Sequence, residues 1–176
     1  TNPGLNVPNA VFNREVRERQ ARYAASLFGR LGAGFHAVRF GWGHYAELHY
    51  PGKSFNQREN CYWGFDDRAQ GRAPGLPPSV QVCPVPGWKP GDPSPAGEAG
   101  RFAEWYLDSL GDYQDFQVAT LRRHFPGRLF ALYADWGIRP GQLAQAVAGN
   151  LSGGTYCEQY DQLQKGYDPA RFVARL

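Results

Sequence analysis

The sequence contains no methionine, three lysines and three cysteines among its 176 residues. Because the chain opens at Thr1 and not at a start residue, we expect it to be a processed or partial chain. It also lacks the run of about eighteen apolar residues that a membrane-spanning helix needs, so we expect no membrane contact. A signal-peptide pattern is missing too, which leaves open whether the protein is secreted or cytoplasmic.

The three cysteines, Cys61, Cys83 and Cys157, have an odd count and no CxxC spacing. A disulfide between Cys61 and Cys83 stays open, although the pattern favours free thiols. His44 and His49 lack HxH and HExxH spacing, and no cysteine pair stands near them. The sequence therefore predicts no metal site.

The positive charge is small and comes almost wholly from arginine. A net charge of +3 from scattered arginines gives no nucleic-acid-binding pattern. Neither GxGxxG nor a Walker loop is present, and no GxSxG motif marks a serine nucleophile. We expect no cofactor and no nucleic-acid partner.

Apolar residues at helical and strand spacing define two similar units. Asn13 can cap a helix that ends at Gly32, and a buried strand over 35–40 follows. A second helix over 101–125 is stopped by proline and glycine and leads to a strand over 129–134. Short helices are expected over 142–148, 156–164 and 169–176. This order predicts an α/β fold with parallel strands and helical crossovers.

The region 48–100 lies between the two units and holds nine of the fourteen prolines. Its large rings argue against a solvated tail, so we expect an ordered loop that walls an active site. These rings are Phe55, Tyr62, Trp63, Phe65 and Trp88. The length fits a single domain over 1–176 but is short for an eight-unit barrel of roughly 250 residues.

The segment 35–51, FHAVRFGWGHYAELHYP, places one carboxylate, Glu47, among aromatic residues. Glycoside hydrolysis needs a carboxylic acid that protonates the leaving oxygen, and partial burial among rings favours the protonated form of a carboxyl group. The alternative is an ion pair with Arg39 or another arginine that merely holds a loop. The residues alone do not decide between the two.

VRFGWGHYAELHYP resembles the segment of β-amylases (family 14) in which a strand runs into a Gly-Glu-Leu-Arg-Tyr-Pro motif that carries the general acid. NCYWGFDDRAQG and FAEWYLDSLGDYQDF resemble the segments that follow it, and the clan-A β-galactosidases (family 42) share the layout. The resemblance covers most of 21–137. It implies part of a (β/α)8 TIM barrel, about strands four to six, with Glu47 as the acid of a polysaccharide-degrading glycosidase.

Two departures leave the family and its stereochemistry open. Ala46 stands where β-amylases have glycine and the clan-A enzymes have asparagine. The second catalytic carboxylate of these families lies on a later strand, and 138–176 offers no such pattern. Asp135, which ends the second strand, is the local substitute, with pairing to Arg139 as the alternative. The remainder of the barrel is then expected as another chain or segment.

Further residues around these strand ends and in the loop are predicted to contact the sugar. They are Trp42, His44, Tyr45, His49, Tyr62, Trp63, Asp66, Trp88 and Trp136. For each ring, ordinary burial is the alternative, and Asp66 is equally suited to a turn. Two other functions stay open: a non-catalytic carbohydrate-binding protein with an aromatic groove, and a small α/β interaction protein whose rings form its core.

Overall fold

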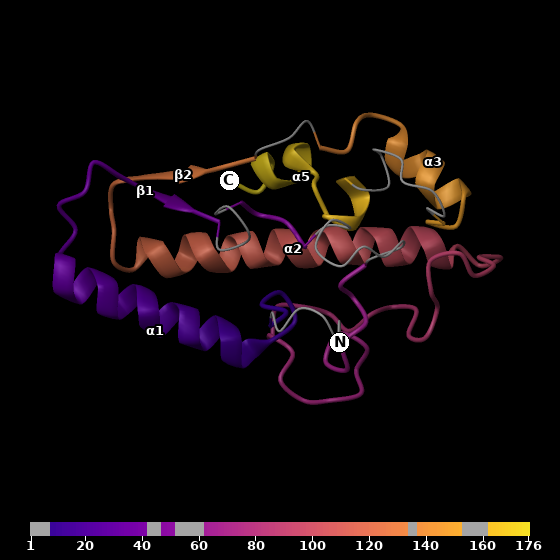
Figure 1. Ribbon diagram of the computed structural model, residues 1–176, viewed down its shortest axis with the longest axis horizontal. Helices are drawn as coiled ribbons and strands as arrows, with labels where there is room; N and C mark the ends of the chain where they lie inside the picture. The colour runs from indigo at the N-terminus through magenta and orange to yellow at the C-terminus, as the bar shows by residue number, and fades with distance from the viewer. Residues whose placement is uncertain (1–7, 42–46, 52–61, 134–136, 153–161) are drawn as a thin grey trace.

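The computed structural model describes residues 8–41, 47–51, 62–133, 137–152 and 162–176. Its central element is the helix α2 (Glu98–Arg122), 25 residues long. In the view of Figure 1, α2 runs along most of the molecule. The two strands and the short C-terminal helices lie above it, whereas α1 and the loop before α2 lie below it. The other elements are therefore arranged around one long helix.

The helix α1 (Arg14–Leu31) begins and ends as its sequence predicts. The side chain of Asn13 accepts a hydrogen bond from the Val16 amide at 3.3 Å. Gly32 ends the helix with φ +72°, and its amide donates to the Phe28 carbonyl. A side chain at this φ is strained, so the glycine is required by the helix end.

The strands β1 (Ala37–Phe40) and β2 (Arg128–Ala131) form a two-stranded parallel sheet. Ala37 pairs with Arg128 and Phe40 with Ala131, and α2 is the crossover between them in sequence. The predicted parallel arrangement is confirmed. Both strands are shorter than predicted, since β1 begins at residue 37 and β2 ends at residue 131. The described residues contain no further strand, so they show no closed barrel.

The helix α2 begins three residues before the predicted start. Glu98 in its first turn suits the positive end of the helix dipole, and the Ser94 hydroxyl accepts a hydrogen bond from the Ala99 amide at 2.9 Å. These polar contacts extend the helix beyond the apolar stripe on which the prediction rested. Its end at Arg122 precedes the Pro126-Gly127 stop.

Two short helices follow β2, α3 (Gln142–Ala148) and α5 (Pro169–Val173). The bounds predicted for α3 are confirmed, and Pro169 opens α5 as predicted, although α5 ends before residue 176. Asp168 caps α5 by accepting a hydrogen bond from the Arg171 amide at 3.1 Å. The helix expected over 156–164 lies mostly outside the described residues.

Ion pairs fasten α5 to the acidic face of α2. The Arg171 guanidinium lies 2.7 Å from carboxylates of both Glu104 and Asp108. Burial lowers the pKa of Arg171, but these two carboxylates more than offset that and leave its pKa raised. Arg175, just beyond α5, lies 2.6 Å from Asp115, which is about two turns further along α2 than Asp108. The C-terminal segment is thus held by carboxylates on several turns of the central helix.

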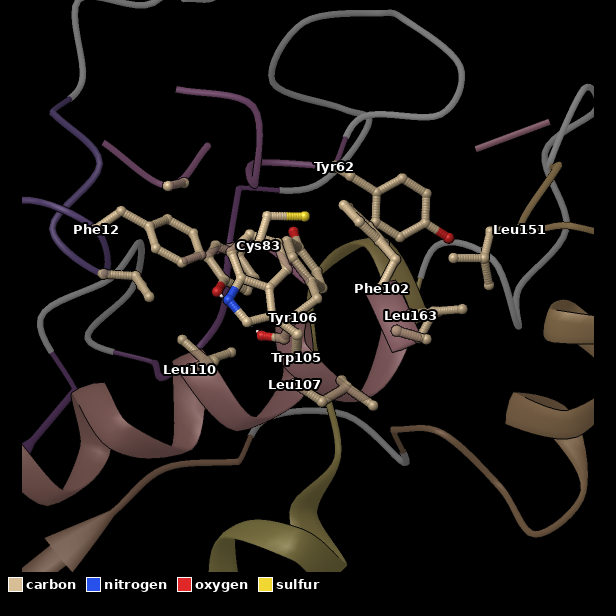
Figure 2. Packing of buried hydrophobic residues seen from close by; sticks show 14 of the residues in the cluster. Phe12, Tyr62, Cys83, Phe102, Trp105, Tyr106, Leu107, Leu110, Leu151 and Leu163 are labelled. Atoms are coloured by element: carbon tan, nitrogen blue, oxygen red, sulfur yellow. Dashed lines mark hydrogen bonds between the residues drawn. The ribbon is translucent and has the colours of Figure 1, made fainter. Parts of the chain in front are cut away.

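The main core cluster surrounds the first half of α2, as Figure 2 shows. The Phe102 ring stacks on the Tyr106 ring. It also contacts the rings of Tyr62 and Trp88 from the loop. The described part of the loop, 62–97, contains no helix or strand, and yet it supplies much of this core. Its buried Cys83 is a free thiol whose pKa is raised by burial. The described part of the loop is ordered, as expected, because its side chains pack against α2.

A second, smaller cluster lies between α1, the sheet and the second half of α2. It contains five buried residues: Ala24, Phe28, Phe40, Leu121 and Phe125. Phe28 stacks on Phe125 with ring centroids 6.0 Å apart. This cluster positions β1, whose C-terminal end leads to the candidate site.

Candidate functional site

Two buried glutamines of α2 hold the chain where it leaves the two strands. Gln117 accepts a hydrogen bond from the Gly41 amide, just after β1, at 3.0 Å. Gln114 accepts one from the Tyr133 hydroxyl, just after β2, at 2.6 Å. Because the two strands are parallel, both exits lie at the same end of the sheet. One face of α2 therefore fixes the edge where barrel-type active sites are built.

The segment 47–50 alternates between buried and partly exposed residues. Leu48 and Tyr50 are buried, and the Tyr50 ring stacks on Tyr106 with centroids 4.2 Å apart. The Tyr50 hydroxyl donates to the Tyr106 carbonyl at 3.1 Å, and its amide donates to the Lys165 carbonyl at 2.8 Å. Tyr50 thus anchors a segment that otherwise lacks regular structure.

Glu47 and His49, the alternate residues of this segment, form a pair. The Nε2 atom of His49 lies 3.2 Å from Oε2 of Glu47. The other ring nitrogen, Nδ1, lies 2.6 Å from the carbonyl oxygen of Tyr50. The His49 side chain is 5% exposed and that of Glu47 16%. The carboxyl group therefore reaches solvent while its imidazole partner is enclosed.

The ring of Tyr167 packs against the imidazole of this pair. His49 stacks on it with centroids 5.8 Å apart and an angle of 27°. The neighbouring Gly166 has φ +69°, and a Cβ there would lie 2.8 Å from Leu110 and 2.9 Å from Tyr50. Only glycine lets the backbone approach the core this closely, so Gly166 brings Tyr167 under His49.

Tyr133 lies just after β2, in the neighbourhood of Tyr167. Burial, with a smaller contribution from the nearby Tyr167, raises the pKa of Tyr133 to about 12. Tyr133 therefore stays neutral and able to donate a hydrogen bond at physiological pH.

The structure describes four of the sugar-contact residues predicted within the loop: Tyr62, Trp63, Asp66 and Trp88. Tyr62 and Trp88 are buried in the main cluster, and the Trp88 indole donates to the Pro93 carbonyl at 3.1 Å. Trp63 is half-buried at the margin of that cluster. Tyr62 and Trp88 are therefore core residues, because α2 offers them an apolar surface.

Asp66 takes the turn role that its sequence also allowed. Its Oδ1 accepts a hydrogen bond from the Ala69 amide at 2.9 Å. Burial raises the pKa of this carboxyl group, and the amide bonds partly offset the effect. Five other predicted site residues lie outside the described residues: Trp42, His44, Tyr45, Asp135 and Trp136.

Three hollows lined by described residues lie elsewhere on the molecule. An apolar groove of about 290 Å³ lies between α1 and β1, and a polar one of about 350 Å³ contains Trp105 and Arg175. A third, beside Tyr23, is lined by α1 alone. None of these three includes Glu47. In the described ranges no three histidine, cysteine, aspartate or glutamate residues group to hold a metal ion.

Sequence reasoning missed the residues that position the pair. Gln114 and Gln117 lie three residues apart in α2, which would place them on one helix face, but an exposed face gives the same spacing. Tyr167 lies 118 residues from His49, so no local pattern links them. The arginine expected as the alternative partner of Glu47 is replaced by His49, and no described arginine forms an ion pair with Glu47.

Comparison of the chain with protein-family models, with curated proteins and with solved structures gives no match. Among the helices that the structure describes, none is both long and apolar enough to cross a membrane.

Proposed function

We propose that this chain is part of a glycoside hydrolase that cleaves O-glycosidic bonds of an oligo- or polysaccharide, with Glu47 as the general acid. The observation that carries the proposal is the Glu47–His49 pair, which lies seven residues beyond β1 and has a solvent-accessible carboxyl group. Protonation of a glycosidic oxygen requires a carboxyl group that keeps a proton and still reaches its substrate. Glu47 meets the second condition, because its side chain is 16% exposed.

The sheet supports the view that further strands complete the domain. Parallel sheets are ordinarily covered on both faces, but Phe130 of β2 is 51% exposed and Phe35, just before β1, is 42% exposed. The apolar groove beside β1 adds more uncovered surface. We propose that the remaining units of a (β/α)8 barrel, in another chain or segment, pack here and bring the second catalytic carboxylate.

The rival function, a carbohydrate-binding protein without catalysis, depends on exposed aromatic platforms. Tyr62 and Trp88, two of the rings it needs, are buried. A buried ring offers no face on which a sugar can stack, so these two rings support neither a binding groove nor a hydrolase subsite. The Glu47–His49 pair is the observation that favours the hydrolase.

Replacing Glu47 by glutamine tests the proposal in the complete gene product. The substrates are aryl glycosides whose leaving groups range from good to poor. General acid catalysis typically contributes 10²–10⁴-fold, so we expect Glu47→Gln to lower kcat by about that factor for poor leaving groups. The loss should be smaller for good leaving groups, which need no protonation.

Glu18→Gln is the matched control, because Glu18 is an exposed carboxylate on α1. It should leave kcat unchanged for every leaving group. Equal turnover by Glu47→Gln and wild type on poor leaving groups would refute the assigned role of Glu47. Sugar binding without any cleavage by the wild type would favour the carbohydrate-binding protein instead.

A further inference from the structure

One edge of β1 is open among the residues that the structure describes. The sheet consists of β1 and β2, so β2 occupies only the other edge. The apolar groove of about 290 Å³ follows the open edge. Ala37, Val38 and Arg39 all line it, although successive side chains of a strand point to opposite faces, and no residue of β2 does. Such an edge presents backbone N–H and C=O groups to which a further strand can bond.

The second wall of the groove is the apolar face of α1, which contributes five residues: Tyr23, Ala24, Leu27, Phe28 and Leu31. Phe35, between α1 and β1, also lines the groove, and its ring meets that of Phe28 edge-on with centroids 6.2 Å apart. Tyr23, Leu31 and Phe35 are 66%, 61% and 42% exposed. Exposed apolar side chains that gather around one groove mark a surface that binds another molecule. The groove therefore offers an apolar wall to the side chains of a segment lying along β1.

The arginines around the groove have no acidic neighbours in sequence. The range 20–41 contains Arg22, Arg30 and Arg39 and no aspartate or glutamate. All three are exposed, and within the described ranges none forms an ion pair, whereas arginines nearer the start of α1 pair with its glutamates. The range 116–133 adds three more arginines and no acidic residue, so the two ranges together carry +6 in a chain whose net charge is +3. The groove therefore lies in a positively charged part of the molecule.

The positive charge and the open edge together select the occupant. A second copy paired through the same edge would bring like charges together, because in a two-fold dimer the same surface meets itself. Nucleic acid and an anionic membrane match the charge, but neither carries a row of peptide groups for the open edge. An extended peptide with acidic residues satisfies the edge, the apolar wall and the charge together.

We propose that the groove beside β1 binds an extended, acidic segment of polypeptide, which adds to the sheet as a third strand. Its apolar side chains lie against α1, and its carboxylates lie near Arg39 and Arg30. Main-chain hydrogen bonds supply much of the affinity in strand addition, and side chains at alternate positions supply the specificity. The inference deepens the proposed completion of the domain and rests on it for the source of the segment, but it requires no role of Glu47.

Synthetic peptides test the proposal on the full chain. The probe is a peptide about nine residues long, capped at both ends and carrying a neutral fluorophore, in which valine alternates with glutamate. We expect saturable binding, measured by fluorescence anisotropy, and an affinity that falls as salt screens the charges. The same peptide with lysine in place of glutamate should not bind. Equal binding of the two peptides, or binding of neither, overturns the proposal.

Methylation of the peptide backbone shows whether the bound segment is a strand. Every second N–H of a strand points to the same side, so methyl groups on one alternate set of nitrogens block one edge of the peptide and leave the other free. We expect one methylated peptide to bind at least about tenfold more weakly and the other to bind like the unmodified probe. Two methylated peptides that bind alike overturn the proposed strand pairing.

Two charge reversals locate the site. Arg39→Glu alters the edge strand and Arg30→Glu the wall on α1, and both side chains are exposed. We expect each to weaken binding of the glutamate peptide about fivefold, and Arg39→Glu to let the lysine peptide bind. Arg101→Glu is the matched control, because Arg101 is an exposed arginine near the start of α2 and does not line the groove. A loss as large in the control as in the groove variants overturns the assignment.

The other occupants predict different results. A dimer in sedimentation experiments that Arg39→Glu alters would assign the groove to a second copy. Vesicles that contain phosphatidylserine, or a single-stranded oligonucleotide, would have to bind more tightly than the glutamate peptide and depend on Arg39. That result would assign the groove to a membrane or to nucleic acid. Each of these outcomes overturns the proposal.

The outcomes distinguish this inference from the proposed function. If the glutamate peptide binds as expected but Glu47→Gln keeps full turnover, the assigned role of Glu47 fails and the docking site stands. If Glu47→Gln loses turnover but no peptide binds, the acid role stands and the docking site fails.

Discussion

The two halves of α2 lie in different surroundings. In the first half, taken here to run from Glu98 to Asp115, buried rings from the loop and the C-terminal segment enclose the helix, and its outer carboxylates pair with arginines of other segments. In the second half, a cluster of five buried residues lies under a two-stranded sheet with an open groove beside it. The range 116–133 contains no acidic residue, and neither does 20–41. One half of the helix is completed by its own chain, and the other half presents uncovered apolar and basic surface.

This difference shows that the irregular loop supplies more of the core than the sheet does. The loop residues Tyr62, Cys83 and Trp88 are all more enclosed than Leu129 of β2. The candidate site is held in place by residues from both halves of α2. Its anchor, Tyr50, packs on the enclosed half, while Gln117 from the open half holds the exit of β1.

The largest expected difference is between truncating a ring in the main core cluster and truncating a ring on the exposed face of the sheet. Phe102→Ala removes a fully buried side chain that meets five other rings, and we expect it to lower the free energy of unfolding by about 4 kcal/mol. Phe130→Ala, on the exposed sheet face, should change it by less than about 0.5 kcal/mol. Urea unfolding measures both. Similar losses in the two variants would show that the sheet face is covered in solution.

A matched leucine pair on the same helix sharpens the comparison. Leu107 is fully buried in the main cluster, whereas Leu121 is buried but lines the open groove. Leu107→Ala leaves an enclosed cavity and should cost about 4 kcal/mol; Leu121→Ala should cost about 2 kcal/mol, because the neighbours can relax into the groove. The difference between the two unfolding free energies is the quantity to measure. Equal costs would contradict the looser packing of the second half.

The smallest expected effect is a pH dependence of stability that arises in the enclosed half. Burial raises the pKa of Tyr113 to about 12, although its hydrogen bond with Gln20 partly opposes this. Because the unfolded chain ionises first, this stability is complete below pH 10 and falls as the pH rises through 12. We expect a loss of about 1 kcal/mol between pH 10 and 11 from this group.

Tyr113→Phe is the control for that titration, since phenylalanine has no ionisable group. Its unfolding free energy should fall less steeply than that of the wild type over the same pH interval. Parallel pH curves for the two proteins would show that Tyr113 ionises as readily in the folded state as in the unfolded chain.

Several elements could be predicted because their causes lie within a few residues. Asn13 and Gly32 mark the ends of α1, and Pro169 marks the start of α5. A helix lies between the two apolar runs that were predicted as strands. Such a helical crossover predicts that the two strands are parallel. The start of α2 was misplaced because the prediction followed apolar spacing, whereas Glu98 and Ser94 stabilise its first turn by polar contacts.

The candidate site was predicted less completely. Sequence reasoning singled out Glu47 and His49, but it assigned the alternative partner of Glu47 to an arginine. It also placed Tyr62 and Trp88 beside the sugar, because an aromatic ring has the same composition whether it faces a ligand or a core. Burial distinguishes the two cases, and burial depends on which distant segments meet.

The sequence by itself determined the approximate places of the described helices and of the two strands, the caps of α1 and the position of one carboxylate after a strand. These features depend on backbone preferences and on contacts between neighbours in the chain. The tertiary structure alone decided that His49 pairs with Glu47, that Tyr167 lies beneath them and that the loop packs as core. Each of these depends on contacts between side chains that must fill space and satisfy hydrogen bonds around α2, and local sequence patterns do not record such contacts.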